Sequence, residues 1–143
     1  MIVDTNILLY ISHKKFSQHT QAYNWFEETI NRKIRIGIPY VSLMGFVRIS
    51  LSQTRIRDAM THQEVLGTAQ QFINFPSVWI PEPAKGYFQI ASDLILEHNL
   101  TKPNDITDAY LAALAIQNSV PLVTHDSGFR RFRELRIIDP IED

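Results

Sequence analysis

NDITDAYLAALAIQNSVPLVTHD, residues 104–126, joins a helix signal directly to a strand signal. The alanine-rich first half predicts a helix from about Asp105 to Asn118, roughly 21 Å long at 1.5 Å per residue. The run PLVTHD is short, rich in β-formers and ends in Asp126, which predicts a buried strand. Because a helix that leads into a buried strand is part of a parallel βαβ unit, this stretch predicts an α/β fold.

The rest of the chain alternates strand and helix signals in the same way. Further strands are expected at residues 1–4, 35–39, 77–80 and 136–139. Helices are expected from Asn6 onward, in a short arginine-rich segment after Asp126, and at residues 18–31, 42–53, 61–75 and 86–99. Thr61 and Glu64 have the spacing of a capping box at the start of one of these helices. We therefore expect a single domain over residues 1–143, with a central parallel sheet flanked by helices on both faces.

Composition narrows the class of protein. The chain has 143 residues, of which 45% are hydrophobic and 20% charged, as in an ordinary globular domain. It has no cysteine, which excludes disulfides and thiolate metal ligands and fits a cytoplasmic protein. The N-terminal residues lack the basic start and long apolar run of a signal peptide, and no stretch approaches the length of a membrane span. We expect no membrane partner.

The formal net charge of −1 argues against a strongly basic nucleic-acid-binding protein. Basic residues nevertheless gather in three places, where they either form solvated faces or contact phosphate. These clusters are Arg32, Lys33 and Arg35; Arg48, Arg55 and Arg57; and Arg130, Arg131, Arg133 and Arg136.

Two aspartates follow predicted strands directly. Asp4 ends the first strand and Asp126 ends the strand in PLVTHD. The carboxyl ends of parallel strands meet at one edge of a sheet, where binding sites gather. Each residue also has a purely structural interpretation, because Asp4 could cap the following helix and Asp126 could begin a turn at Ser127–Gly128. These residues alone leave both interpretations open.

Asp105 and Asp108 are three positions apart, so they share one face of the predicted helix. Asn104 is the predicted N-cap, which places Asp108 beyond the positions that capping explains. Ala112 and Ala115 continue the row and indicate close packing below the carboxylates. In a right-handed crossover, the start of this helix lies at the sheet edge that carries the other two aspartates.

Four carboxylates gathered at one edge would repel one another unless a cation compensated their charge. The five histidines share no metal-ligand spacing, so the donors are oxygens alone, which suits Mg²⁺ or Mn²⁺ better than zinc. Such ions activate water and stabilise charge on phosphoryl groups. The expected chemistry is metal-assisted hydrolysis of a phosphodiester.

VDTN (residues 3–6), TDAYLAALAIQNSVPLVTHD (residues 107–126) and GFRRF (residues 128–132) together resemble the PIN domain. More narrowly, the chain resembles the VapC ribonuclease toxins of bacterial toxin–antitoxin pairs, from Asp4 to RIIDP at its end. The resemblance implies an endoribonuclease dependent on Mg²⁺ or Mn²⁺, acting on tRNA or another structured RNA. It also implies a cognate VapB-like antitoxin and a homodimer.

The resemblance assigns roles to the aspartates. Asp4, Asp108 and Asp126 match the acidic positions that hold the catalytic metal in the family. Asp105 stands where some relatives carry an additional acid, so we expect it to be a fourth ligand or one that binds through water. Asn6 matches the polar residue that supports the first aspartate.

Three other positions qualify the resemblance. Thr124 is expected to support the site through its hydroxyl group. Most members carry a glutamate in the pattern S-x-x-x-E-x-x-R, but VSLMGFVRIS places Gly45 there, and we expect Asp105 to replace the missing charge. Arg48, three residues later, either binds RNA phosphate or forms a structural salt bridge.

Two alternatives remain. A phosphatase of the haloacid-dehalogenase type would need a second aspartate where Asn6 stands and a lysine before the late acids. A PIN fold with a weakened site could instead act by binding protein or RNA.

Four aromatic residues are expected in the core: Trp25, Trp79, Phe88 and Tyr110.

Overall fold

The computed structural model describes residues 1–52 and 60–141, which contain a five-stranded sheet in the order β3-β2-β1-β4-β5. All four neighbouring pairs are parallel, as predicted. On the central strand, Ile2 pairs with Leu122 on one side and with Gly37 on the other. The strands are β1 (Ile2–Val3), β2 (Ile36–Gly37), β3 (Val78–Trp79), β4 (Leu122–Val123) and β5 (Ile137–Ile138).

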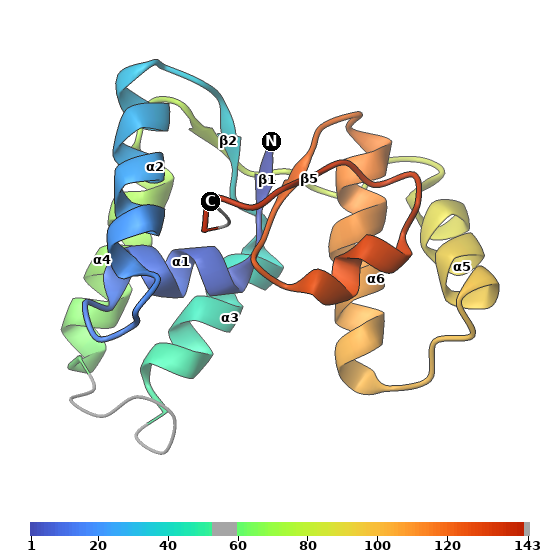
Figure 1. The fold of residues 1–143 in the computed structure, drawn as a ribbon, viewed down its shortest axis with the longest axis horizontal. Helices are drawn as coiled ribbons and strands as arrows, with labels where there is room; N and C mark the ends of the chain where they lie inside the picture. Colours follow the sequence, from blue (N-terminus) through green and yellow to red (C-terminus); the bar gives the residue numbers. More distant parts are fainter. Residues whose placement is uncertain (53–59, 142–143) are drawn as a thin grey trace.

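Helices cover both faces of this sheet (Figure 1). Ile2 packs into the core formed with α5 and α6, whereas Val3 packs into the core formed with α1 to α4. This alternation explains why the strands are apolar throughout. None of the helices in the described ranges is long and apolar enough to cross a membrane. The helical segments are α1 (Thr5–Ser12), α2 (His19–Asn31), α3 (Tyr40–Ser50), α4 (His62–Asn74), α5 (Tyr87–Glu97), α6 (Pro103–Gln117) and the 3₁₀ helix η1 (Ser127–Arg131).

Helix α6 begins two residues earlier than predicted, and Asn104 is not its N-cap. Lys102 holds that position without a side-chain capping bond, and Pro103 is the first helical residue. Proline suits this position because its φ is already helical and the N–H it lacks would have had no partner there. Asp105 therefore lies in the first turn, near the positive end of the helix dipole, while Asp108 lies beyond it.

The other predicted boundaries differ from the structure by a few residues. Helix α3 ends at Ser50, short of the predicted Gln53, which lies outside the described residues together with Arg55 and Arg57. The capping box at α4 is confirmed. The Thr61 hydroxyl accepts a hydrogen bond from the Glu64 amide at 3.2 Å, and the Glu64 carboxylate accepts one from the Thr61 amide at 2.7 Å.

The prediction that Phe88 lies in the core is wrong, because its side chain is 81% exposed. Tyr87, Ala91 and Leu94 form the inward stripe of α5, and a residue one position further along a helix is turned by about 100°. The other three aromatic residues predicted in the core are partly buried against the two apolar clusters: Trp25, Trp79 and Tyr110.

Candidate active site

Asp4 follows β1 at the carboxyl edge of the sheet and is 9% exposed. Its Oδ1 accepts a hydrogen bond from the Thr5 amide at 2.6 Å, and its Oδ2 accepts one from the Thr124 hydroxyl at 2.8 Å. Burial raises the pKa of Asp4 to about 6, although both hydrogen bonds lower it; the charge of Asp126 raises it further. Asp4 thus caps α1, which was its purely structural interpretation from the sequence. It also places a buried carboxylate at the carboxyl edge of the sheet.

Thr124 connects Asp4 to its neighbours. Its hydroxyl donates to Asp4 and accepts from the Asn6 Nδ2 and from the Asp126 amide, both at 3.1 Å. A hydroxyl has one donor and two acceptor sites, so this group is fully used. The residue is 1% exposed, and its hydroxyl links the side chains of Asp4 and Asn6. The Oδ1 of Asn6 is buried and has no hydrogen-bond partner among the described residues.

Asp105 and Asp108 share one partner, Arg131. The Arg131 Nη1 donates to Asp105 Oδ1 at 3.0 Å, and its Nη2 donates to Asp108 Oδ2 at 2.7 Å. Burial raises the pKa of Asp108 to about 6, against the lowering effect of Arg131, while Asp126, Asp4 and Asp105 raise it further. Ala112 and Ala115 are fully buried, which confirms the close packing expected along this face.

Asp126 is the most exposed of the four aspartates. Its Oδ1 accepts a hydrogen bond from the Gly128 amide at 2.7 Å and caps η1, so the turn interpretation is also correct. Its charge nevertheless raises the pKa of both Asp4 and Asp108, so the three carboxylates lie within electrostatic range of one another. Within residues 1–52 and 60–141, however, no three His, Cys, Asp or Glu side chains form a group that could hold a metal ion.

The chemistry of the donors fits a hard divalent cation, even though their positions are not those of a closed site. All candidate ligands are carboxylate or amide oxygens, which Mg²⁺ and Mn²⁺ prefer. Asp4 and Asp108 bury charge at a cost that a cation would remove, as their raised pKa values show. The buried Oδ1 of Asn6, which has no hydrogen-bond partner among the residues that the structure describes, is a further oxygen acceptor linked to Asp4 through Thr124.

Comparison with known proteins identifies the family. The PIN domain model matches residues 1–135. The chain belongs to the PIN-domain family. Ribonuclease VapC33 of Mycobacterium tuberculosis is 30% identical over 143 residues, covering 100% of this chain and 99% of the relative. Ribonuclease VapC37 of the same species is 27% identical over 139 residues, covering 97% and 96%.

Solved structures support the same PIN fold. VapBC2 from Rickettsia felis, bound to a DNA fragment from its promoter, gives a TM-score of 0.65 at 18% identity, covering 96% of each chain. VapBC-1 from nontypeable Haemophilus influenzae gives 0.65 at 12% identity, covering 99% of this chain and 98% of that one. The resemblance to VapC proteins is therefore confirmed, and the phosphatase alternative is set aside.

The structure shows what occupies the space around Gly45 in this PIN domain. A Cβ at this position would lie 2.5 Å from the Thr5 Oγ1 and 3.0 Å from its Cγ2. The Thr5 hydroxyl donates to the Ser42 carbonyl at 3.2 Å, which fixes the threonine against α3. A glutamate at position 45 would therefore collide with Thr5, the residue that follows Asp4.

Arg48 lies in the last turn of α3 with an exposed side chain. This exposure argues against the partly buried salt bridge considered from the sequence, and its role in binding RNA stays a prediction. His125, which follows Thr124, places its Nδ1 2.9 Å from Asp139 Oδ2.

The sequence shows Arg131 only as one member of an arginine cluster and does not reveal its contacts with Asp105 and Asp108. GFRRF gives only a partial signal: Phe129 and Phe132 are both 1% exposed and anchor the segment that carries Arg130 and Arg131. Because nothing in the spacing indicates which of two adjacent arginines turns inward, the pair with Asp105 and Asp108 could not be assigned from the sequence.

Proposed function

We propose that the protein is a metal-dependent endoribonuclease and the toxin of a toxin–antitoxin pair. Its membership of the VapC-like PIN proteins supports the ribonuclease class. The observation that carries the metal dependence is the buried carboxylate of Asp4, whose pKa is raised to about 6 at the edge shared with Asp108 and Asp126. Ionising a buried carboxylate near other carboxylates costs free energy, and a bound cation would offset that cost.

In this proposal Asp4, Asp108 and Asp126 hold Mg²⁺ or Mn²⁺, with Asp105 as a fourth ligand. A divalent cation bound there supplies Lewis acidity toward a phosphodiester and its attacking water. Hydrolysis would form a P–O bond to the oxygen of the attacking water and break the P–O bond to one ribose oxygen, which leaves as a hydroxyl group after taking up a proton.

The neighbouring side chains of this proposed site orient its ligands. Thr124 directs its hydroxyl to Asp4 and so favours the ionised carboxylate. Asn6 is held by the same hydroxyl through its Nδ2, which leaves its Oδ1 available as an acceptor. The exposed Arg48 contacts substrate phosphate.

The experiment that tests the activity is cleavage of total RNA by the purified protein, with the cut sites mapped by sequencing. We expect cleavage with Mg²⁺ or Mn²⁺, loss of cleavage with EDTA, and recovery when metal is added back. A tRNA or another structured RNA is the proposed substrate. Cleavage that persists in EDTA would contradict the metal dependence, and absence of cleavage with either metal would contradict the activity.

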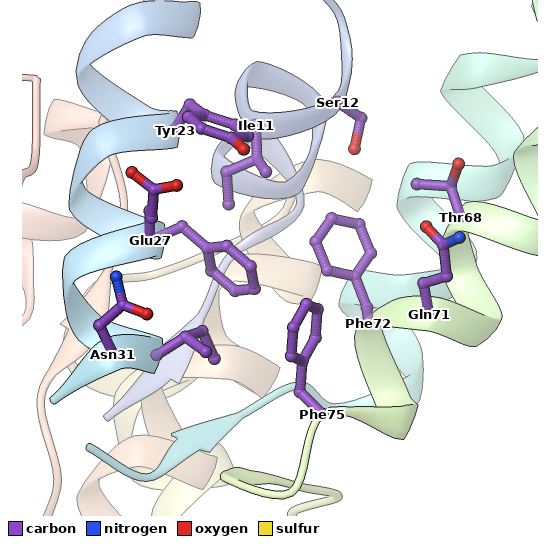
Figure 2. Close-up of a pocket in the computed structure, with 11 residues that line it drawn as sticks. Ile11, Ser12, Tyr23, Glu27, Asn31, Thr68, Gln71, Phe72 and Phe75 are labelled. Atoms are coloured by element: carbon purple, nitrogen blue, oxygen red, sulfur yellow. The ribbon is translucent and has the colours of Figure 1, made fainter. Parts of the chain in front are cut away.

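We further propose that the antitoxin docks in an apolar groove between α1, α2 and α4. The groove has a volume of about 430 Å³, and Figure 2 shows aromatic and aliphatic side chains from these elements around it. The solved structural relatives include VapBC and FitAB complexes, which supports a protein partner with apolar anchor residues. The apolar lining includes Ile11, Tyr23, Phe26, Ile30, Phe72 and Phe75.

Tyr23 offers a test of this docking site because it is 45% exposed and lines the groove. Tyr23→Asp should weaken binding of the cognate antitoxin by at least tenfold in calorimetry. Leu66→Asp is the control, because Leu66 is 55% exposed on α4 but does not line the groove. Equal affinities for the two variants would contradict the proposed docking site.

A homodimer is proposed as the free form. Phe88 and Leu96, which are 81% and 77% exposed, lie eight residues apart on α5 and therefore on a similar side of that helix. Light scattering should report a dimer that Phe88→Ser with Leu96→Ser converts to a monomer. A wild-type protein that stays monomeric at micromolar concentration would contradict this part of the proposal.

A second candidate function is that of a PIN protein that acts through binding alone. Two observations favour it: Thr5 fills the space of the usual glutamate, and the described residues offer no ready group of three metal-binding side chains. Growth arrest on expression separates the candidates. Asp4→Asn should abolish the arrest caused by an enzyme and leave the arrest caused by a binding protein unchanged.

A further inference from the structure

Arg131 contacts two of the four candidate ligands with one guanidinium group. Its Nη1 donates to Asp105 and its Nη2 to Asp108, at 3.0 and 2.7 Å. The side chains of all three residues are between 21% and 27% exposed, so solvent screens the pair only in part. The guanidinium is charged at every physiological pH, and it supplies one positive charge at the place where the carboxylates gather.

The position of Arg131 is fixed by its surroundings rather than by the ion pairs alone. It is the last residue of η1, between Phe129 and Phe132, which are both 1% exposed. Its guanidinium carbon lies 4.9 Å from the centre of the Phe132 ring, within the range of a cation–π contact. The Nε is buried and has no hydrogen-bond partner in the part of the chain that the structure describes.

The segment that carries Arg131 begins directly after Asp126. Asp126, a candidate metal ligand, therefore lies at the start of this short segment. Arg131, whose positive charge pairs with two other candidate ligands, lies at its end. A cation that binds Asp108 meets a carboxylate whose Oδ2 already accepts a charged hydrogen bond. The cation and the guanidinium repel each other and compete for the same negative charge.

We propose that Arg131 is the built-in counter-ion of the metal-free site and that it gives up its bond to Asp108 when a divalent cation binds. The inference rests on the proposed function, because it requires a metal at these carboxylates. It accounts for the absence of a ready metal-binding group among the described residues, since Arg131 keeps two of the ligands engaged. It implies that metal binds more weakly than the four carboxylates alone would allow.

The test is the affinity for Mn²⁺ of Arg131→Gln, measured by electron paramagnetic resonance of the free ion at low ionic strength. We expect Mn²⁺ to bind this variant roughly tenfold more tightly than the wild type, because the competing charge is gone. Arg133→Gln is the matched control: it removes an equal charge from an exposed arginine two residues away and should change the affinity by less than about twofold.

Arg131→Lys keeps the charge but replaces the planar guanidinium, which pairs with both aspartates, by a single ammonium group. It should bind Mn²⁺ with an affinity between those of the wild type and Arg131→Gln. If Arg131→Gln does not fold, as judged by circular dichroism, the lysine variant decides: tighter binding than wild type supports the proposal, and equal or weaker binding overturns it.

Other results overturn the inference in distinguishable ways. If Arg131→Gln and Arg133→Gln bind Mn²⁺ with equal affinity, the ion pairs of Arg131 do not affect metal binding. A weaker affinity would mean that Arg131 orients Asp108 for the metal instead of competing with it. Absence of Mn²⁺ binding by the wild type and by every variant would overturn the metal dependence of the proposed function together with this inference.

Discussion

The carboxylates of Asp4 and Asp108 have similarly raised pKa values of about 6, but the protein stabilises them in different ways. Asp4 is held by uncharged donors, the Thr5 amide and the Thr124 hydroxyl, which belong to the adjoining backbone and strand. Asp108 is held by the charged Arg131. The Asp4 region therefore stays in place whether or not a cation is present, whereas the Asp108 region depends on an exchangeable positive charge.

The largest effect on activity is expected from a substitution in the Asp4 region. Asp4→Asn should lower metal-dependent RNA cleavage at least ~100-fold, because the amide cannot supply the anionic oxygen that a metal requires. The fold should persist, since an asparagine oxygen can still accept the bond from the Thr5 amide. Initial rates with Mn²⁺ measure the effect. Asp93→Asn, an exposed substitution on α5, serves as the control, and full activity of Asp4→Asn would contradict the account.

In the Asp108 region, the effects of substituting Asp105 and Asp108 on RNA cleavage can be compared directly. Asp108→Asn should lower cleavage by at least about tenfold, since it removes a ligand charge. If Asp105 replaces the glutamate missing at Gly45, Asp105→Asn should impair cleavage about as strongly in the same assay. Near-normal cleavage by Asp105→Asn would mean that this residue serves mainly as the partner of Arg131.

A smaller effect, on stability, is expected where Thr5 packs against Gly45. Gly45→Ala should destabilise the protein by roughly 1–3 kcal/mol through the clash with Thr5, outweighing the gain of up to about 1 kcal/mol that alanine brings to a helix. Gly67→Ala is the control: a Cβ there meets nothing within 4 Å, and the change should stabilise the protein. Urea unfolding measures both.

Thr5→Ala should relieve most of the cost of Gly45→Ala when the two are combined, because it removes the Oγ1 and Cγ2 atoms that a Cβ would meet. Additive destabilisation in the double variant would contradict this explanation of the missing glutamate.

The smallest expected effect is the pH dependence of the metal-free fold. The folded pKa of Asp4 and of Asp108 lies above the ordinary value of 3.8, so each contributes stability that is complete below about pH 4 and is lost as pH rises through about 6. Between pH 7.5 and 5, the wild type in EDTA should gain on the order of 1–2 kcal/mol relative to Asp4→Asn with Asp108→Asn.

The comparison with this double variant is necessary because burial lowers the pKa of His13, which opposes the effect below about pH 6.5. Unfolding by urea at each pH measures the difference. Parallel stability curves for the two proteins would mean that the two carboxylates are not coupled to folding.

The parallel sheet and its covered faces were predictable from strand and helix periodicity and from the rule for parallel connections, as were the positions of Asp4 after β1 and of Asp105 and Asp108 near the start of α6. The start of α6 was not, because Pro103 and Asn104 both favour a helix N-terminus and only the packing decides between them. The role of Arg131 and the contact of Thr5 with Gly45 depend on the approach of segments distant in sequence, which local patterns do not encode.

The account is tested most directly by the crystal structure of the protein soaked in Mn²⁺, with the ion located by its anomalous scattering. We expect Mn²⁺ between the carboxylates of Asp4, Asp108 and Asp126, with oxygen ligands about 2.1 Å away, and Arg131 withdrawn from Asp108. Absence of Mn²⁺ from this edge of the sheet, with the pair between Arg131 and Asp108 intact at saturating metal, would contradict it.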